Sequence, residues 1–183
     1  KKKYVKCAVE SALNQTYKNI EIVCIDDAST DNSNNILKEL ANKYNNIILL
    51  EECTNLGVCK ARNKAIDIAS GEYVLPLDAD DIIEPSYIEK AVEILNNNSN
   101  ISIVYCKAKT IGTRNKVWKL PIYNKDKILF ENCIFCSALF RKKDFYKVGK
   151  YKNNMNNGCE DWDLWLSFIE NNFEVYQIPE ILF

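Results

Sequence analysis

The stretch YVLPLDADD, residues 73–81, joins a short apolar run to three aspartates, Asp78, Asp80 and Asp81. The apolar run predicts a buried strand, and the aspartates then lie at its carboxyl end, where open α/β sheets bind ligands. Carboxylates this close repel each other unless a cation or hydrogen-bond donors lie among them. Hard oxygen ligands suit Mg²⁺ or Mn²⁺. The stretch therefore predicts a metal–phosphate site, and a solvated acidic turn that caps the next helix is the plain alternative.

Apolar spacing on both sides of this strand predicts alternating helices and strands. Helices are expected around residues 5–13, 36–44, 58–69 and 85–95, and strands at 20–25, 47–50, 73–77 and 101–106. This alternation predicts an α/β fold with a Rossmann-like, mostly parallel sheet flanked by helices. Pro76 lacks an N–H, so the paired part of its strand should end before it or be irregular there.

The alternation weakens after residue 106. Residues 107–141 are expected to form loops and strands, followed by an amphipathic helix around Trp162 and a last strand at 175–178. No repeat or linker is evident. We therefore expect a single domain over residues 1–183, with a nucleotide-binding half at 1–106 and a mixed half at 107–183.

Composition limits the kinds of partner and compartment. The 183 residues suffice for one domain with a sizeable core, and the net charge of −1 gives no general attraction to nucleic acid. No apolar run reaches the length that spans a bilayer, and no signal peptide is visible. The 8 cysteines are scattered, so we interpret them as reduced thiols of a cytosolic protein. Cys133-x-x-Cys136 is a lone CxxC in a chain without histidine, which favours a structural role over a metal or redox role.

Two further stretches should reach the same sheet edge as Asp78. Asp26 and Asp27 end the strand at 20–25, and a carboxylate there can accept from a nucleobase N–H or a ribose hydroxyl. The turn at Gly57 precedes a helix whose Arg62 could reach a base or a phosphate. The alternatives are helix capping by the aspartates and an ordinary surface arginine.

A fourth stretch, GCEDWD at residues 158–163, places Glu160 and Asp161 at the start of a helix. Acidic residues are favoured there by the helix dipole, which is one sufficient explanation. The functional interpretation makes Asp161 a general base, because a hydroxyl nucleophile needs an acceptor for its proton. Trp162 is a candidate sugar-stacking wall, whereas Trp165 is expected in the core.

Four segments together resemble family 2 glycosyltransferases of the GT-A fold. They are QTYKNIEIVCIDDASTDNS (15–33), NLGVCKARNKAI (55–66), SGEYVLPLDADD (70–81) and NGCEDWDLWL (157–166), and they occur in the order and spacing of that family. The resemblance runs from about Val5 to Phe183. Each segment alone is moderately specific, and four in order are a strong signal.

The resemblance assigns roles to particular positions. Asp27 matches the aspartate that binds uracil, with Asp26 beside it, and Arg62 matches the arginine near the nucleotide. The stretch from Asp78 to Asp80 matches the DxD motif. By this match Asp80 is the direct metal ligand, and Asp78 lies nearer the ribose or donor sugar and also belongs to the metal site. The supporting and acceptor-side positions are Asp81, Glu160 and Trp162, and the catalytic base is Asp161.

The resemblance also implies chemistry and partners. It implies an inverting transfer from a nucleotide-diphosphate sugar, UDP-linked, to a hydroxyl of a glycan or lipid-linked acceptor in bacterial surface polysaccharide synthesis. Mn²⁺ or Mg²⁺ is the implied cofactor, and the expected place is the cytoplasm, at the inner face of the membrane. Any peripheral membrane association is expected through segments outside residues 1–183. A first strand before Lys1 and a C-terminal tail that completes the metal site are expected outside residues 1–183. Two alternatives stay open: a non-catalytic nucleotide-sugar-binding domain and, less favoured, a nucleotidyltransferase.

Overall fold

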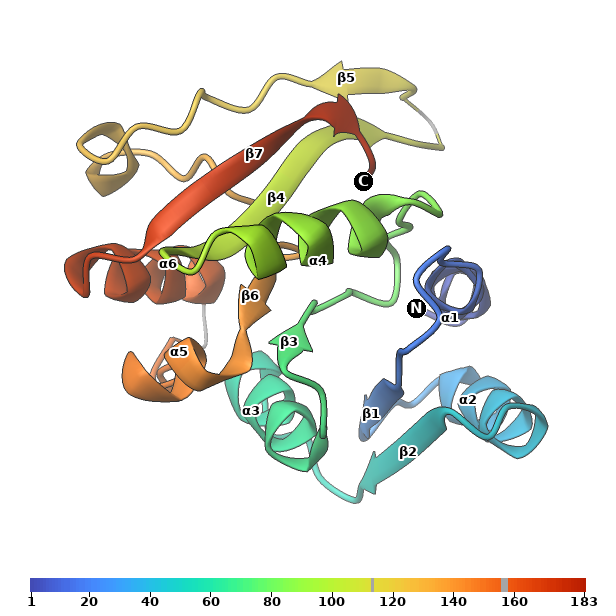
Figure 1. Ribbon diagram of the computed structural model, residues 1–183. Coiled ribbons are helices and arrows are strands. Elements are labelled where there is room, and N and C mark those ends of the chain that lie inside the picture. Colours follow the sequence, from blue (N-terminus) through green and yellow to red (C-terminus); the bar gives the residue numbers. More distant parts are fainter. Residues whose placement is uncertain (113, 156–157) are drawn as a thin grey trace.

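The structure is a computed structural model that describes residues 1–112, 114–155 and 158–183. It confirms the α/β fold class, with helices packed around two groups of strands (Figure 1). The first half contains α1 (Val5–Leu13), β1 (Ile22–Asp27), α2 (Ser33–Lys43), β2 (Ile47–Glu52), α3 (Val58–Ile68), β3 (Tyr73–Val74), α4 (Tyr87–Asn97) and β4 (Ile101–Thr110). The second half contains β5 (Lys116–Trp118), the short 3₁₀ helix η1 (Lys127–Leu129), β6 (Leu139–Arg141), α5 (Lys142–Lys147), α6 (Glu160–Glu170) and β7 (Glu174–Ile181).

The strands form two separate sheets. β1 and β2 pair in parallel from Ile22↔Ile47 to Asp27↔Glu52. In the larger sheet β4 pairs in parallel with β7 and antiparallel with β5 and β6, and β6 also pairs antiparallel with β3. In Figure 1 α4 lies across β4, while α1 and α2 lie beside the β1–β2 pair.

β3 is shorter than its sequence predicts. The apolar run continues to Leu77, but the strand ends at Val74, two residues before Pro76. This confirms the expectation that pairing stops before the proline, because proline has no N–H to donate to a ladder. The segment from Leu75 onward then runs free of the sheet and delivers Asp78 to its edge.

A cleft of about 980 Å³ separates β1 from β3. Apolar side chains of α1, β1, α3 and residues 73–77 line it, and Lys1 lies among the lining residues. The cleft leaves β1 partly exposed, because Ile22, Val23, Cys24 and Ile25 are only half-buried. All four residues line the cleft, and Ile22 and Cys24 also pack against buried residues of α1, α2 and β2.

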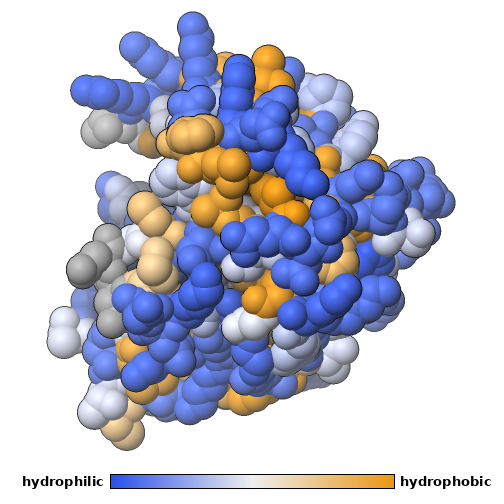
Figure 2. Space-filling model, turned by 90° about the vertical axis from the view of Figure 1, so that its left-hand side faces the viewer, coloured by the Kyte–Doolittle hydropathy of each residue, from blue (hydrophilic) through white to orange (hydrophobic). Residues whose placement is uncertain are grey.

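The segment that follows β4 forms an outer edge of the molecule. β5 pairs with the end of β4, and the chain then runs through an extended stretch to η1 (Figure 1). Figure 2 views the molecule from the side on which η1 lies; apolar side chains (orange) gather there in the upper part of an otherwise hydrophilic surface.

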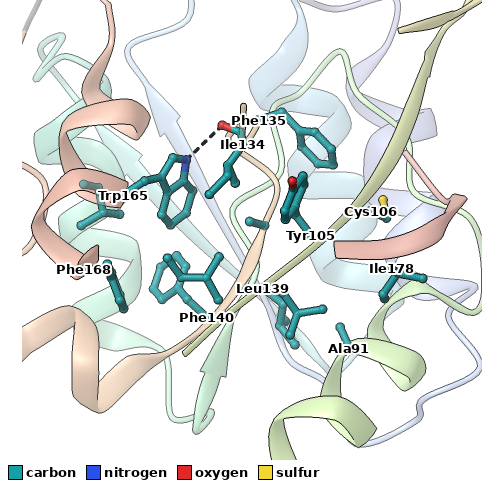
Figure 3. Packing of buried hydrophobic residues seen from close by; sticks show 14 of the residues in the cluster. Ala91, Tyr105, Cys106, Ile134, Phe135, Leu139, Phe140, Trp165, Phe168 and Ile178 are labelled. Atoms are coloured by element: carbon teal, nitrogen blue, oxygen red, sulfur yellow. Dashed lines mark hydrogen bonds between the residues drawn. The ribbon is translucent and has the colours of Figure 1, made fainter. Parts of the chain in front are cut away.

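The main hydrophobic core lies between β4, β6, α4 and α6 (Figure 3). Trp165 is fully buried, as expected, and its indole N–H donates to the carbonyl of Ile134 at 3.1 Å. Phe140 stands at the centre, with its ring 5.4 Å from that of Phe145 and 5.9 Å from those of Trp165 and Phe168. A smaller second cluster joins α1, α2 and β2. The larger core takes residues from both halves of the sequence, so the halves are packed together.

The structure also bears on the cysteines and on membrane-spanning helices. All eight cysteines, each of which lies in the described part of the chain, carry free thiols. Within the residues that the structure describes, none of the helices has both the length and the apolar content needed to cross a bilayer.

Candidate functional site

Arg62 joins two of the stretches that the sequence singled out. Its Nη2 donates to Asp78 Oδ1 and its Nη1 to Glu160 Oε1, both at 2.8 Å. The Arg62 side chain is 12% exposed, and its guanidinium lies 5.5 Å from the centre of the Tyr151 ring. A planar guanidinium can hold two carboxylates in fixed directions, which an ammonium cannot. Arg62 therefore fixes the segment after β3 to the start of α6.

An acidic cluster lies beside this arginine. Ligand atoms of Asp78, Asp81 and Cys136 all lie within 4.8 Å of one another. The turn is closed by the Asp81 N–H, which donates to the Asp78 carbonyl at 3.0 Å. Burial, together with the carboxylates of Asp78 and Asp80, raises the pKa of Asp81 to about 6. The cluster thus has an excess of negative charge that a cation would relieve.

Cys136 contributes a thiol, not a thiolate, to this cluster. Burial and then the Asp78 carboxylate raise the pKa of Cys136 to about 12. Its Sγ lies 3.8 Å from Asp78 Oδ2, so the thiol acts as a weak donor to that oxygen. The groups available to a metal are therefore carboxylate oxygens, which suit Mg²⁺ or Mn²⁺ and leave room for waters and phosphate oxygens.

Asp80 lies apart from this cluster. Its side chain is 45% exposed, and its Oδ1 accepts from Lys1 Nζ at 2.6 Å. The structure thus brings together Asp78 and Asp81, whereas Asp80, the position assigned the direct metal contact from sequence, pairs with a lysine.

Asp27 and Asp26 lie on opposite faces of β1. The Asp27 carboxylate accepts from the backbone N–H groups of Leu56 at 2.6 Å and Gly57 at 3.0 Å, and so holds the turn before α3. Asp27 also lines the cleft. Asp26 is 5% exposed and accepts from Asn34 Nδ2 at 2.8 Å, on the α2 side. Of this pair, the structure brings only Asp27 to the turn that leads into Arg62's helix.

Asp161 occupies the first turn of α6, next to Glu160. It is partly buried, and its Oδ2 accepts from Asn132 Nδ2 at 3.4 Å. Burial, and also the negative charge of Glu160, raise the pKa of Asp161 above that of an ordinary aspartate. Its Oδ1 accepts from the backbone N–H of Trp162 at 2.8 Å. A carboxylate with a raised pKa is a stronger base than an ordinary one, and its about four acceptor positions leave room for a donor hydroxyl.

The neighbours of Asp161 have structural partners. The Glu160 side chain is 13% exposed and is occupied by Arg62. Trp162 is half-buried, and its indole N–H donates to the carbonyl of Ile128 at 2.7 Å. These contacts position the start of α6. Asn157, the first residue of the fourth sequence segment, lies outside the described residues.

Three residues of the site were missed from sequence: Asn132, Cys136 and Tyr151. Each comes from a loop, and each is connected to the site only through a partner distant in the chain. Cys136 had a visible signal, the CxxC spacing, but that spacing does not indicate a contact with Asp78.

The chain matches a family model described as "Glycosyl transferase family 2" over residues 1–149. It is 32% identical over 177 residues to an uncharacterized glycosyltransferase of Haemophilus influenzae, covering 88% of this chain and 55% of that protein. The chain spans 55% to 66% of the lengths of the first three curated relatives it matches.

Solved structures share the fold. The S. aureus TarS 1–349 complex with UDP superposes with a TM-score of 0.76 at 20% identity, over 98% of this chain and 55% of that one. Mannosyltransferase PcManGT of Pyrobaculum calidifontis, in complex with GDP-Man and Mn²⁺, gives 0.74 at 18% identity, over 99% and 52%. At these identities the likeness confirms the GT-A fold.

Proposed function

The chain belongs to glycosyl transferase family 2, and we propose from this premise that it transfers a sugar from a UDP-sugar to a hydroxyl group of a glycan or lipid-linked acceptor, with inversion of configuration. The proposal extends to the class of acceptor, a growing bacterial surface polysaccharide. It is the function that the arrangement of Asp78, Arg62 and Asp161 supports best.

The observation behind the proposal is the link that Arg62 makes. Asp78 belongs to the acidic cluster, and Glu160 precedes the candidate base Asp161, yet one buried guanidinium binds both carboxylates at 2.8 Å. A transferase must hold a donor diphosphate and a deprotonating carboxylate in fixed relation, because the reacting atoms have to meet in line. A domain that only binds nucleotide has no need of this coupling.

On the donor side, we assign the nucleotide to Asp27 and the diphosphate to the acidic cluster. Asp27 already accepts two N–H groups, and a carboxylate has about four acceptor positions, so it can still accept from a base N–H. Asp78 and Asp81 fit a divalent cation because their carboxylate oxygens are hard ligands that lie close together, and Asp80 can join them if it leaves Lys1. The bound ion would supply electrostatic stabilisation of the leaving diphosphate.

On the acceptor side, we assign proton transfer to Asp161. Its carboxylate takes the proton from the acceptor hydroxyl while that oxygen forms a bond to the anomeric carbon. The bond from the anomeric carbon to the diphosphate oxygen breaks, and its electron pair leaves with the nucleotide. Asn132 holds Oδ2 in place during this step, and Glu160 keeps the local charge negative.

We also propose a domain organisation. Residues 1–183 form one GT-A domain with a nucleotide-sugar half, 1–106, and an acceptor half, 107–183; the core shared between the halves supports a single unit. A strand that precedes Lys1 is proposed to fill the cleft between β1 and β3. The size of the cleft and its apolar lining support this.

Calorimetric titration tests the proposed function. UDP is titrated against GDP and CDP, with Mn²⁺ and with EDTA, and UDP-sugars are then screened for sugar release or transfer. We expect UDP to bind more tightly than the other nucleotides and more tightly with metal. A finding that no nucleotide binds, in a chain that circular dichroism shows to be folded, would refute the proposal.

A pair of variants on α6 separates transfer from binding. Asp161→Asn should retain UDP affinity and lose turnover, whereas Glu170→Gln, an exposed change at the far end of the same helix, should retain both. Metal-dependent UDP binding without turnover in the unaltered chain would favour the non-catalytic binding domain instead.

A further inference from the structure

The segment of residues 114–131 exposes an unusual amount of apolar surface. Ile122 and Phe130 are 82% and 83% exposed, more than any other large apolar side chain in the described part of the molecule. Val117, Trp118 and Leu129, in the same segment, are 56%, 46% and 55% exposed. Figure 2 faces the side on which η1 lies and shows apolar side chains gathered in its upper part. A concentration of this kind marks an interaction surface, whereas single exposed residues do not.

The same segment is basic. It contains five exposed cationic residues against two acidic ones and so carries a net charge of +3, although the whole chain has −1. The cationic residues are Arg114, Lys116, Lys119, Lys125 and Lys127. Among the described residues, the lysines that form ion pairs lie elsewhere in the chain, as in Lys90–Glu180 and Lys109–Glu84. The charge of the segment is therefore available to a partner.

The segment is anchored to the body of the protein. Ile128 of η1 is fully buried, and its carbonyl accepts from the indole of Trp162. The Trp118 ring stacks on Phe135 with their centres 6.4 Å apart. Since Ile128 points inward between Lys127 and Leu129, the segment holds its cationic and apolar side chains outward as a defined surface.

We propose that residues 114–131 bind the surface of an anionic lipid membrane. Ile122, Leu129 and Phe130 enter the headgroup region, where apolar and aromatic side chains are stabilised, and the lysines meet anionic headgroups. This inference stands on the segment alone and does not depend on the proposed transfer reaction.

Two other occupants fit the segment less well. A polyanionic glycan would use the lysines but gains nothing from aliphatic side chains that are more than half exposed. A second copy of the chain would cover the apolar groups but would bring two segments of charge +3 together. Of the three occupants compared, the anionic membrane is the one that uses both features.

The surface lies close to the candidate base. Trp162, which follows Asp161, is bonded to Ile128 of the segment, and Asn132, just beyond the segment, donates to Asp161. A membrane bound at residues 114–131 would therefore lie next to the acceptor side of the site.

Vesicle sedimentation tests the inference. The chain is mixed with vesicles of phosphatidylcholine alone or with 30 mol% phosphatidylglycerol, and the partition coefficient is measured at 0.1 M and 0.5 M salt. We expect binding to the anionic vesicles that weakens with salt. Removal of one lysine, as in Lys119→Ser, should lower the partition coefficient about fivefold, and Phe130→Ser about tenfold or more.

A matched variant controls for general loss of apolar surface. Ile68→Ser removes a 45% exposed side chain from the end of α3, outside the segment, and should leave partitioning unchanged. Trp118 provides a second readout, because its emission should shift to the blue on binding while Trp165 is already buried. Circular dichroism confirms that each variant is folded.

Three outcomes would overturn the inference: no sedimentation with anionic vesicles, equal binding to neutral vesicles that salt does not affect, or an equal loss in Ile68→Ser and Phe130→Ser. Light scattering after gel filtration gives a fourth. If the chain is a dimer that Phe130→Ser makes monomeric, a second copy covers the segment and the membrane proposal is wrong.

Discussion

Replacement of Arg62 by methionine should destabilise the protein far more than an ordinary loss of an ion pair. Arg62 is 12% exposed and holds Glu160 and Asp78, whose side chains are 13% and 38% exposed. In Arg62→Met, Asp78 can turn toward water. Glu160 cannot do so without loosening the start of α6, so its charge stays buried without a partner.

The expected loss in the free energy of unfolding follows from this difference in exposure between Glu160 and Asp78. Breaking a fully buried pair costs about 3–5 kcal/mol, and breaking an exposed one about 0–1 kcal/mol. With one buried and one half-exposed carboxylate, we expect the free energy of unfolding to fall by about 3 kcal/mol at pH 7. For a chain of this size that lowers Tm by about 6–12 °C.

The assay is thermal and urea unfolding followed by circular dichroism and by tryptophan fluorescence, which should agree if unfolding is two-state. Lys38→Met is the control, because Lys38 and Glu51 form a 2.7 Å ion pair whose side chains are 49% and 46% exposed. The double variant Arg62→Met/Glu160→Gln should regain much of the lost stability, since it removes the buried charge. An equal cost for Arg62→Met and Lys38→Met, or no recovery in the double variant, would refute the reasoning.

Four further predictions concern the site. Asp161→Asn should lower kcat by about 10²–10⁴-fold with UDP affinity unchanged by calorimetry, and a large loss of affinity would count against the base assignment. Burial and Glu160 raise the pKa of Asp161, and a general base acts only when it is ionised. In the unaltered chain kcat/KM should therefore fall as the pH drops through that raised pKa and level off above it. The same fall of kcat/KM at low pH in Asp161→Asn would contradict this prediction. Asp81→Asn should reduce the strengthening of UDP binding by Mn²⁺, and a full metal effect in titrations of that variant would exclude Asp81 from the metal site. Asp27→Asn should weaken UDP binding tenfold or more with or without metal, and unaltered affinity would remove Asp27 from the nucleotide contacts.

Much of the fold could be predicted because its signals are local. Apolar spacing identifies α1 through Val5 and Val9, both buried as expected, and the missing N–H of Pro76 predicts where β3 stops. Pairing was harder to predict. β6 lies between β3 and β4 and is antiparallel to both. This arrangement depends on pairs such as Val74↔Phe140, and the apolar spacing of either segment does not indicate them.

The site was predictable as a set of stretches and less so as a geometry. Neighbouring strand residues point to opposite faces, so Asp26 and Asp27 could not share one environment. Arg62 was expected to face a nucleotide, but its partner Glu160 lies 98 positions away, and no local pattern reports such a contact. The roles of these residues in binding and transfer remain predictions.

The position of β4 has a consequence for the order of events during synthesis. β4 is paired from Ile101 to Lys107 with β7, which is made about 70 residues later, so its apolar side chains leave the ribosome well before this neighbour exists. At about 5–20 residues per second this interval lasts about 4–15 s. During that time the nascent chain presents an unpaired strand edge, and the larger core can close only when β7 emerges. A chain cut before Glu174 would keep every acidic residue of the candidate site and still be unable to complete its sheet.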